Sequence, residues 1–589
     1  MLRLIQRFSV IFVCFLGSLI VILIMANTPS AKSSLLSDPF LQFPSKDSIK
    51  VVWFTEFLGD ENKVVYGNNL EQISIAKTTK LSRTREDQNS KIIPPYSQTT
   101  PRDIWRHEGE VMGLTPGVRV PYQVVSIRSD RGFKETIKSD IFSLESQPQP
   151  GTPLKILLTS DHQLMPLVAA NLQKVVETVD QIDAVFLAGD LVNIADRASE
   201  WFDDMRGGAF FPCLQGRANY ALEKEGVTTV YRGGKLIQNA PIFPAIGNHE
   251  VMGRFSQEKG LNQQFVDAIP VGAAEKIYQK NIQSINPSNK PSIEKKWLTN
   301  NSFNVDTYEE IFSITKNNLG NKKYYAISFG DIRLVVLYLT NIWRSPNLEP
   351  NIKGRYQEAK NNLNQPENWG YGQHIFEAIT PNSSQYQWLE KELASEEFTQ
   401  AKYKMVMFHH PVHTLGGNIV PPYTDPVAKI NYNDSEKIAS IRYEYPKEND
   451  YIIRDLMPLL ESAGVDFIFF GHSHLWNRFI NDKGINFLES SNVGNTYGAH
   501  LGENHRPIPP DYSKINYVET GDPNGLDPIV PNLDPLIGEN NQPLPYIASN
   551  DITVFSILDT AKGTVSSYRF DTRNPHSEVI KFDEFTIIH

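Results

Sequence analysis

The sequence predicts a layered α/β domain preceded by a small all-β domain. Two patterns in the chain of 589 residues indicate this. Over residues 47–146, short runs of β-type residues alternate with turns, which is typical of a small β-sandwich. Over residues 153–589, apolar strands are separated by helical or irregular segments, the pattern of an α/β domain. The chain is also too long for one hydrophobic core, so roughly two to four domains are expected.

The all-β domain is predicted from four strand-like runs, which cover residues 51–55, 63–66, 120–125 and 141–144. The turn formed by residues 114–117 punctuates them. A linker that contains proline and glycine, residues 147–153, then ends the domain.

Five strands of the α/β domain carry the functional argument, because each is followed within two residues by a potential metal ligand. The strands cover residues 155–159, 184–188, 242–246, 404–408 and 466–470, and the residues that follow them are Asp161, Asp190, Asn248, His409 and His472. Active sites of α/β sheets gather at the carboxyl ends of strands. We therefore expect these side chains to meet at one site.

Other elements are predicted around these strands. Helices are expected at 166–180, 384–395 and 451–463, and a hairpin at 324–339. The stretch from about 254 to 322 is expected to be an insertion. After a strand at 485–489 comes a loop from about 506 to 547, and strands at 552–555 and 565–568 should extend the central sheets.

Composition and charge restrict the function classes. Apolar residues make up 40% of the chain and charged residues 21%, which argues against extensive disorder. A net charge of −10 gives no general attraction for nucleic acid, so we expect no nucleic-acid partner. Only Cys213 of the two cysteines belongs to the folded region, so stability there must come from core burial and bound metal.

Residues 1–32 have the pattern of an export signal or an N-terminal membrane anchor. Arg3 and Arg7 precede an apolar run from Phe8 to Ala26. The run is close to the ~20 residues that a membrane-spanning helix needs, so a cleaved signal and a retained anchor both stay open. We expect the protein to be exported, as a secreted, periplasmic or membrane-anchored protein whose folded part faces away from the cytoplasm.

The individual residues suit a metal cluster. His472 and His474 are two apart on an extended chain, so both imidazoles can point the same way. Asn248 offers an amide oxygen, and Asp190 offers a carboxylate that can bridge two cations. Of the neighbours His409 and His410, one is expected to be a ligand and the other a supporting or core residue.

In order, spacing and strand context, these residues resemble the motifs of the calcineurin-like metallophosphoesterase superfamily, over roughly 154–498. Within it the chain looks most like the purple acid phosphatases, through residues 52–55, 113–117, 385–390 and 582–585. The resemblance implies a four-layer fold, a β-sandwich flanked by helices, and a fibronectin type III-like N-terminal domain.

The resemblance also implies roles. It places Asp161 and His474 on a first metal and Asp190 as the bridge between the two metals. Asn248, His409 and His472 would bind the second metal. His249 becomes the acid that protonates the leaving oxygen, and His410 and His413 become supporting or substrate-facing groups.

Two residues depart from the family pattern. The first motif usually ends in histidine, but here Gln163 stands at that position and the histidine is His162. On an extended segment Gln163 would point with Asp161 and His162 away from it, so we expect Gln163 as a weak ligand or supporting donor, with His162 as the alternative. Asn193 replaces the tyrosine that binds ferric iron in purple acid phosphatases, so ferric iron should be poorly stabilised. We expect a colourless site with two divalent ions, Mn, Zn or Fe.

Such a site predicts hydrolysis of small-molecule phosphate esters. Two cations ~3.5–4 Å apart neutralise phosphate charge and lower the pKa of a bridging water, which then attacks in line. The main hypothesis is a phosphomonoesterase similar to acid phosphatases. The alternatives are a phosphodiesterase that uses the same site, and a non-catalytic exported binding protein with a weakened metal site. The sequence predicts no oligomeric state.

Several nearby side chains allow two interpretations. Substrate oxygens could be held by Arg206, Arg232 and Arg254, although surface charges are the commoner role for at least two of them. A substrate wall or, more typically, the core could be formed by Trp201, Phe202, Phe210 and Phe211.

Overall fold

The computed structural model describes residues 34–130, 132–314, 322–418 and 422–587. The predicted export signal or anchor, residues 1–32, lies outside the described residues. Among the described helices, none is both long and apolar enough to cross a membrane.

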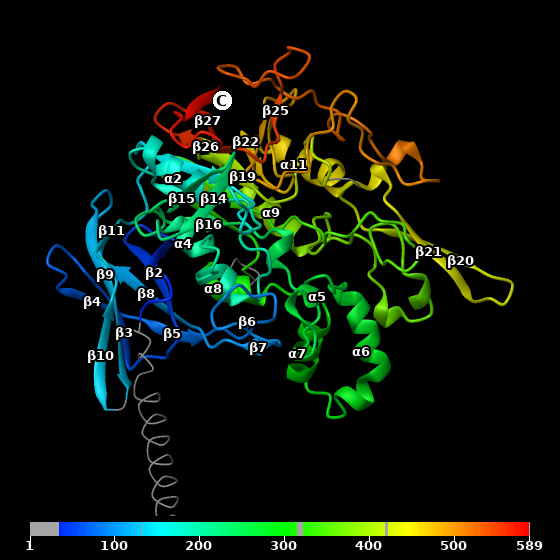
Figure 1. Ribbon diagram of the computed structural model, residues 1–589, viewed down its shortest axis with the longest axis horizontal. Coiled ribbons are helices and arrows are strands. Elements are labelled where there is room, and N and C mark those ends of the chain that lie inside the picture. Colours follow the sequence, from blue (N-terminus) through cyan, green and yellow to red (C-terminus); the bar gives the residue numbers. More distant parts are fainter. Residues whose placement is uncertain (1–33, 131, 315–321, 419–421, 588–589) are drawn as a thin grey trace, which may run out of the picture.

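The N-terminal part of the described chain is all-β (Figure 1). One sheet contains, in spatial order, β1 (Phe40–Gln42), β2 (Ser48–Thr55), β8 (Trp105–Met112) and β5 (Lys77–Lys80). The other contains β10 (Phe133–Lys138), β9 (Val120–Asp130), β3 (Glu61–Tyr66) and β4 (Gln72–Ile75), with β11 (Phe142–Leu144) paired to β9. A shared apolar core lies between them, where Trp53 Nε1 donates to Ser126 Oγ at 3.0 Å.

Strand β2 is buried on both faces. Val51 and Trp53 belong to the core of the N-terminal region, whereas Val52 and Phe54 belong to the core of the α/β domain. Because successive side chains of a strand point to opposite faces, this strand joins the two cores. The Phe54 ring lies 5.0 Å from that of Phe202. Four aromatic residues take the more typical of the two roles considered above, since all are buried in the core, namely Trp201, Phe202, Phe210 and Phe211.

The α/β domain contains two sheets. The first, in spatial order, consists of β16 (Ile242–Pro244), β13 (Ala184–Leu187), β12 (Lys155–Thr159), β26 (Ile552–Asp559), β27 (Thr564–Asp571) and β28 (Ile580–Thr586). The second consists of β17 (Tyr325–Phe329), β18 (Ile332–Val336), β19 (Tyr403–Met407), β22 (Phe467–Phe470), β24 (Asn486–Ser490), β23 (Trp476–Ile480) and β25 (Tyr546–Ile547). Strands β12, β13 and β16 run parallel, as do β18, β19, β22 and β24.

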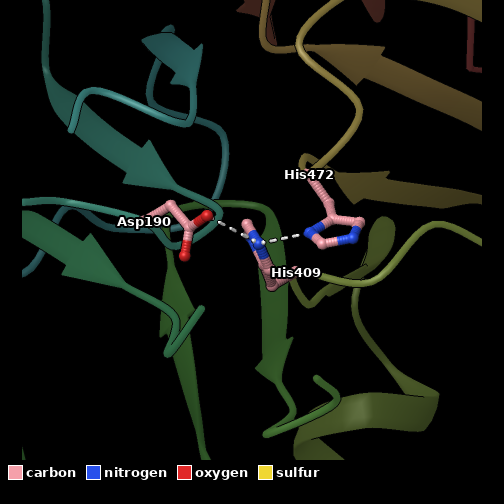
Figure 2. Close-up of side chains that lie close together, drawn as sticks. All are labelled: Asp190, His409 and His472. Carbon is pink, nitrogen blue, oxygen red and sulfur yellow. Dashed lines mark hydrogen bonds and ion pairs between the residues drawn. The ribbon is translucent and has the colours of Figure 1, made fainter. Parts of the chain in front are cut away.

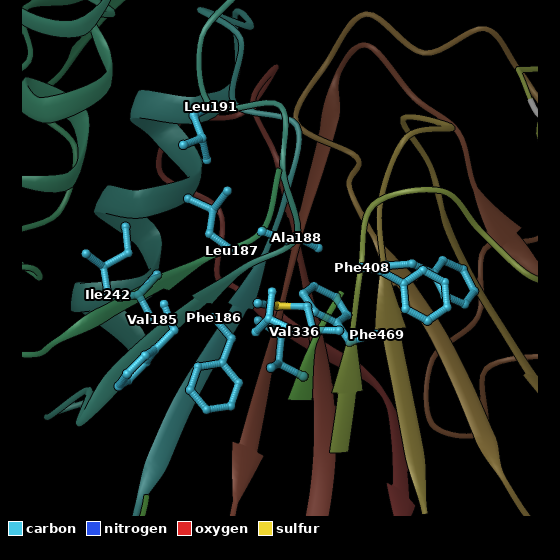
Figure 3. Packing of buried hydrophobic residues seen from close by; sticks show 14 of the residues in the cluster. Val185, Phe186, Leu187, Ala188, Leu191, Ile242, Val336, Phe408 and Phe469 are labelled. Atoms are coloured by element: carbon cyan, nitrogen blue, oxygen red, sulfur yellow. The ribbon is translucent and has the colours of Figure 1, made fainter. Parts of the chain in front are cut away.

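The two sheets share one apolar core (Figure 3). Val185 and Phe186 from the first sheet and Val336 and Phe469 from the second are fully buried in it. The five strands predicted to carry ligands are therefore divided, three in one sheet and two in the other. Their carboxyl ends nevertheless meet, because the sheets pack against each other. The predicted closing strands do extend the first sheet, since β26 pairs antiparallel with β12.

Helices cover the sheets as the α/β class requires. Helix α2 (Val168–Thr178) connects β12 to β13, and α9 (Ser384–Leu393) is capped by Ser383, whose side chain accepts from Tyr386 N. The predicted helix at 451–463 consists of a π-helical turn, Ile452–Leu456, followed by α11 (Met457–Ser462). Within the stretch predicted as an insertion, the described residues form α5 (Leu261–Phe265), α6 (Val271–Ile285), α7 (Pro291–Asn301) and α8 (Asp306–Ile311).

One excursion of the N-terminal region reaches the α/β domain. Between β5 and β8 the chain forms a short hairpin of β6 (Arg85–Glu86) and β7 (Thr100–Pro101). This hairpin extends from the N-terminal sheets toward the helical region around α5 (Figure 1). The backbone of Arg85 in this hairpin forms an isolated parallel β-bridge with that of Arg197, the residue just before α3 (Ala198–Phe202).

Candidate metal centre

Six side chains that the sequence singles out converge at the carboxyl ends of the strands. All are at most 4% exposed, and they are Asp161, Asp190, Asn248, His409, His472 and His474. Five of them form two groups of potential metal ligands, Asp190 with His409 and His472, and Asp161 with Asp190 and His474. Within each group the ligand atoms lie within 4.8 Å of one another. The two groups share Asp190, the residue predicted to bridge.

The first group centres on His409 (Figure 2). Its Nε2 lies 3.1 Å from Asp190 Oδ2, 3.2 Å from Asn248 Oδ1 and 3.2 Å from His472 Nδ1. Its Nδ1 lies 2.8 Å from the carbonyl oxygen of Ala188 and must donate to it. In the neutral ring Nε2 therefore carries a lone pair that faces a carboxylate and an amide oxygen. A cation between these groups would bind all of them.

The second group is oriented in the same way. His474 Nδ1 donates to the carbonyl of Asn495 at 2.9 Å, which turns Nε2 toward Asp161 Oδ1 at 3.4 Å. A ligand histidine whose second nitrogen donates to a backbone carbonyl has a fixed tautomer and ring orientation. The backbone N–H of His472 donates to Asp161 Oδ2 at 2.9 Å and holds the carboxylate in place.

The charges and polar atoms of the cluster suit bound cations. Burial disfavours the protonated form of His409, but the Asp190 carboxylate outweighs this and raises the pKa of His409 to about 10. Burial raises the pKa of Asp190, yet His409 and His249 hold it well below its usual range. In the part of the chain that the structure describes, Asp161 Oδ1 and His472 Nε2 are buried without a hydrogen-bond partner. Carboxylate, amide and imidazole ligands of this kind fit two divalent transition metals.

The backbone at the ligands is strained. The φ angles of Asp161, Asp190, His472 and His474 are 59°, 56°, 83° and 56°, a left-handed region that costs non-glycine residues free energy. Such strain is found at functional sites, where it aims side chains that an extended strand would point elsewhere. Gly247 belongs to the same arrangement, because a β-carbon there would overlap the Asp190 carboxylate.

Two buried glutamates that sequence analysis gave no role support the ligand loops. Glu250 accepts from the backbone N–H groups of Asp190 at 2.8 Å and Gly247 at 2.7 Å. Glu489 accepts from Ser473 N at 2.7 Å. Burial raises the pKa of each glutamate to about 8, with a further contribution from Asp190 or Asp161, respectively. The sequence offers a signal for Glu250, which lies in the motif of residues 247–250. It offers none for Glu489, which follows an ordinary apolar run.

The departures from the family pattern have a structural basis. The chain after Asp161 is not extended as the prediction assumed, since φ is 59° there and 36° at Gln163. Gln163 nevertheless points into the cluster, and its Nε2 donates to Asp190 Oδ2. His162 points away from it, with Nε2 3.0 Å from Thr159 Oγ1. Burial lowers the pKa of His162 to about 4, as suits a neutral core side chain.

Two further histidines lie behind the ligands. The buried ring of His410 packs 4.8 Å from Tyr423 and 5.1 Å from His472, and burial lowers its pKa to about 3. His413 Nδ1 lies 2.7 Å from Asp522 Oδ2. Neither residue lines the pocket described next, so neither faces a substrate there.

An open pocket of about 770 Å³ lies over the cluster. His249 lines it, and its Nδ1 donates to the carbonyl of Asn193 at 2.7 Å while its backbone N–H donates to Asp190 Oδ1 at 2.9 Å. Asn193, which stands where the resemblance expects a tyrosine, also lines the pocket.

The three arginines proposed to hold substrate do not line this pocket. Arg206 pairs with Asp204, and the guanidinium of Arg232 donates to the carbonyl of Ala218. Arg254 makes a bidentate pair with Asp267, through Nε at 3.0 Å and Nη2 at 2.8 Å. These commitments leave the arginines as structural or surface charges.

Buried charges connect the pocket to the N-terminal excursion. Asp87, which follows β6, lies 3.1 Å from Arg197 Nη2, and Arg197 Nη1 donates to Glu200 Oε1 at 2.7 Å. Glu200 Oε2 accepts from the backbone N–H groups of Asn193 at 2.8 Å and Ile194 at 2.7 Å. Asn193 in turn holds His249, so this network fixes the position of that ring.

The same network holds a second wall of the pocket. Asp87 Oδ2 accepts from the backbone N–H of Leu261 at 2.7 Å, at the start of α5. Arg197 Nη2 donates to Asn262 Oδ1 at 2.6 Å, and Asn262 lines the pocket. A residue from the N-terminal excursion thus positions both sides of the site.

Comparisons with known proteins agree with this geometry. The family model for calcineurin-like phosphoesterases matches residues 154–475. No curated protein matches the chain. A purple acid phosphatase from yellow lupin (Lupinus luteus) seeds is similar in structure, with a TM-score of 0.51 and 14% identity, over 94% of this chain and 74% of that chain. At that identity the likeness shows the fold alone.

A second solved structure, the anchor in the inner membrane complex of Plasmodium, aligns over 73% of this chain and 89% of its own, with a TM-score of 0.27 and 9% identity. A likeness that low carries no argument. The family model, in contrast, matches more than half of the chain and spans the strands that carry all six ligand candidates. This protein therefore belongs to the calcineurin-like phosphoesterase family, and its site is one for metal-dependent hydrolysis of phosphate esters.

Proposed function

We propose that the protein is a phosphomonoesterase that uses two divalent cations, Mn, Zn or Fe. One observation carries the proposal: two groups of buried metal ligands share Asp190, and Asp190 lines one pocket with His249. Bound there, two cations would neutralise phosphate charge and activate a water for in-line attack. Asp161 and His474 would hold one cation, Asn248, His409 and His472 the other, and Asp190 both.

The proton for the leaving oxygen is assigned to His249. Its Nδ1 is committed to the carbonyl of Asn193, so Nε2 is the nitrogen left to carry an acidic proton. The ring stacks on Phe265 at 5.1 Å, which limits its rotation. A general acid needs this kind of fixed approach to the leaving atom.

One observation favours phosphodiester hydrolysis as a second candidate. Among the described residues, no lysine or arginine lines the pocket. A diester carries one negative charge where an ionised monoester carries up to two, so a diester makes the smaller demand on a pocket without such cations. The convergence of all six ligands argues against the alternative of a non-catalytic binding protein.

The test is metal reconstitution. The purified protein is stripped with a chelator, reloaded with Mn, Zn or Fe singly, and assayed with p-nitrophenyl phosphate and bis-p-nitrophenyl phosphate. We expect metal-dependent turnover that favours the monoester and is lost in Asp190→Ala. With benzyl phosphate, whose leaving alkoxide needs protonation as p-nitrophenolate does not, His249→Gln should lower kcat by about 10²–10⁴-fold. The matched control is His505→Gln, at an imidazole whose side chain is 52% exposed.

The outcomes separate the candidates. Turnover of the diester alone would replace the first proposal with the second. No turnover with any metal, or full activity in Asp190→Ala, would refute both.

We also propose that the protein acts outside the cytoplasm. The proposal rests on the apolar run from Phe8 to Ala26 behind Arg3 and Arg7. Cell fractionation combined with N-terminal sequencing tests it: recovery in the cytoplasmic fraction with an intact N-terminus would refute it.

A further inference from the structure

The mouth of the pocket is aromatic and uncharged. Its walls include three aromatic rings and three asparagines, namely Phe265, Trp343, Tyr497, Asn193, Asn262 and Asn418. With no lysine or arginine among the described lining residues, the charge of the phosphate must be met at the ligand cluster and its histidines. What lies beyond the phosphate therefore meets flat apolar surfaces and neutral amides.

Two of the rings are open to solvent. Trp343 is 41% exposed and Tyr497 is 53% exposed. Within the described chain, Trp343 makes no hydrogen bond and no ring contact. Two of the three rings adjoin histidines: Tyr497 lies 5.2 Å from His474, and Phe265 stacks on His249. A flat ligand that covered these rings would remove their apolar surface from water.

The aromatic walls are held rigidly in place. Arg344, next to Trp343, is buried, and its Nη2 donates to the carbonyls of Ala268 at 2.6 Å and Gly370 at 3.0 Å, while Nη1 donates to that of Val266. The loop of Trp343 is thereby fixed against the segment that follows Phe265. A preformed wall lowers the entropy lost on binding.

Cations close to this wall are paired with groups of the protein. Arg254 and Lys353 pair with Asp267, at 2.8 and 3.0 Å, and Arg197 Nη2 donates to Asn262 Oδ1. Asp267 lies one residue beyond Val266 of the wall, so its carboxylate offsets positive charge there. A substrate with several anionic groups would find no partner for the additional ones.

We propose that the phosphate ester hydrolysed here carries a flat, uncharged aromatic ring, an aryl group or a nucleobase, on its alcohol portion. This inference rests on the proposed function and adds the substrate class to it. The pocket reaches from the ligand cluster out to Trp343 and Asn418, so it extends beyond what a phosphate group alone requires. The ring stacks on the exposed aromatic faces, and the asparagines donate to and accept from its polar edge.

The test uses two pairs of phosphate monoesters matched in leaving group. Adenosine 5′-monophosphate and ribose 5-phosphate both release a primary ribose alkoxide and differ in the base. Benzyl phosphate and cyclohexylmethyl phosphate both release a primary alkoxide and differ in aromaticity. We expect kcat/KM to be at least tenfold higher for the aromatic member of one pair. The pair that shows this difference tells whether the preferred group is a nucleobase or an aryl group.

Variants tie that preference to the wall. Trp343→Ala should lower the kcat/KM ratio at least fivefold, and Trp343→Phe, which keeps a ring, should retain most of it. Phe133→Ala, at a phenylalanine that is 80% exposed in the N-terminal sheets, is the matched control and should leave kcat/KM unchanged for both members of a pair.

Ratios within twofold for both pairs, or an unchanged ratio in Trp343→Ala, would overturn the inference and leave the proposed function standing, because turnover of the two non-aromatic esters reports that function alone. Turnover of none of the four esters would overturn both.

Discussion

Arg197→Met should weaken both the fold and the catalytic site, because the guanidinium neutralises two buried carboxylates. The side chain is 5% exposed, and it pairs with Asp87 and Glu200, whose side chains are 0% and 3% exposed. Removing one member of a buried ion pair typically costs about 3–5 kcal/mol, since the charge left behind is uncompensated. We expect this loss in the free energy of unfolding, measured by urea denaturation of the metal-loaded protein.

Activity should fall as well. Burial already raises the pKa of Glu200, so without Arg197 this carboxylate should take up a proton and weaken its hydrogen bonds to the Asn193–Ile194 backbone. That backbone carries the carbonyl that orients His249, and a shift of about 1 Å at a reacting group can cost about 10²-fold in rate. We expect kcat to fall by about that factor at saturating metal.

A double-mutant cycle makes this prediction refutable. Asp87→Asn combined with Arg197→Met removes both charges of one pair, so the double variant should lose less stability than the sum of the single variants. Arg217→Met is the control, because its side chain is 46% exposed in a pair with Asp38 and should cost at most about 1 kcal/mol. Arg197→Met with wild-type kcat and a loss no larger than that of the control would refute the reasoning.

Three further predictions concern the metal centre. His409, with a pKa of about 10, is protonated at pH 7 in the metal-free protein but neutral as a ligand. Metal uptake should therefore release a proton, and metal affinity should rise up to about tenfold per pH unit from pH 7 toward 10. Calorimetric heats of metal binding that do not depend on the buffer would contradict this. Glu489→Gln should lower metal affinity about 10- to 100-fold in a chelator competition assay, and an unchanged affinity would show that the Ser473 contact is dispensable. Protein loaded with iron in air should show no purple charge-transfer band in its visible spectrum, because Asn193 supplies no phenolate.

The sequence could predict the strands and the ligands because each ligand follows an apolar run directly. Asp190 and His472 are examples: the strands before them are fully buried, so the local pattern shows where they end. The division of these strands between two sheets has no such local signal, because parallel strands buried on both faces are alike in sequence. The hairpin β20 (Val427–Tyr432) with β21 (Ile438–Glu444) was missed for the opposite reason, since every residue of β20 is exposed and no alternation marks it.

The supporting residues were harder to foresee than the ligands. Asp87 acts on Leu261 and Arg197 across more than a hundred residues of sequence, and nothing near it in the chain marks that role. Its position depends on how the N-terminal sheets dock, which β2 decides by being apolar on both faces. The prediction that arginines hold the substrate was wrong for a related reason. Each guanidinium pairs with an acceptor of the protein itself, as Arg254 does with Asp267.

The origin of the ligands implies that metal binding contributes to the fold as well as to the chemistry. Asp161, Asp190 and Asn248 follow strands of the first sheet, whereas His409, His472 and His474 follow strands of the second. Each proposed cation would therefore be bound from both sheets at once. The strained backbone at these residues costs free energy that bound cations would offset. Because the ligand set exists only when the sheets are packed together, a cation present at about 1,000 times its dissociation constant should stabilise the fold by about 4 kcal/mol.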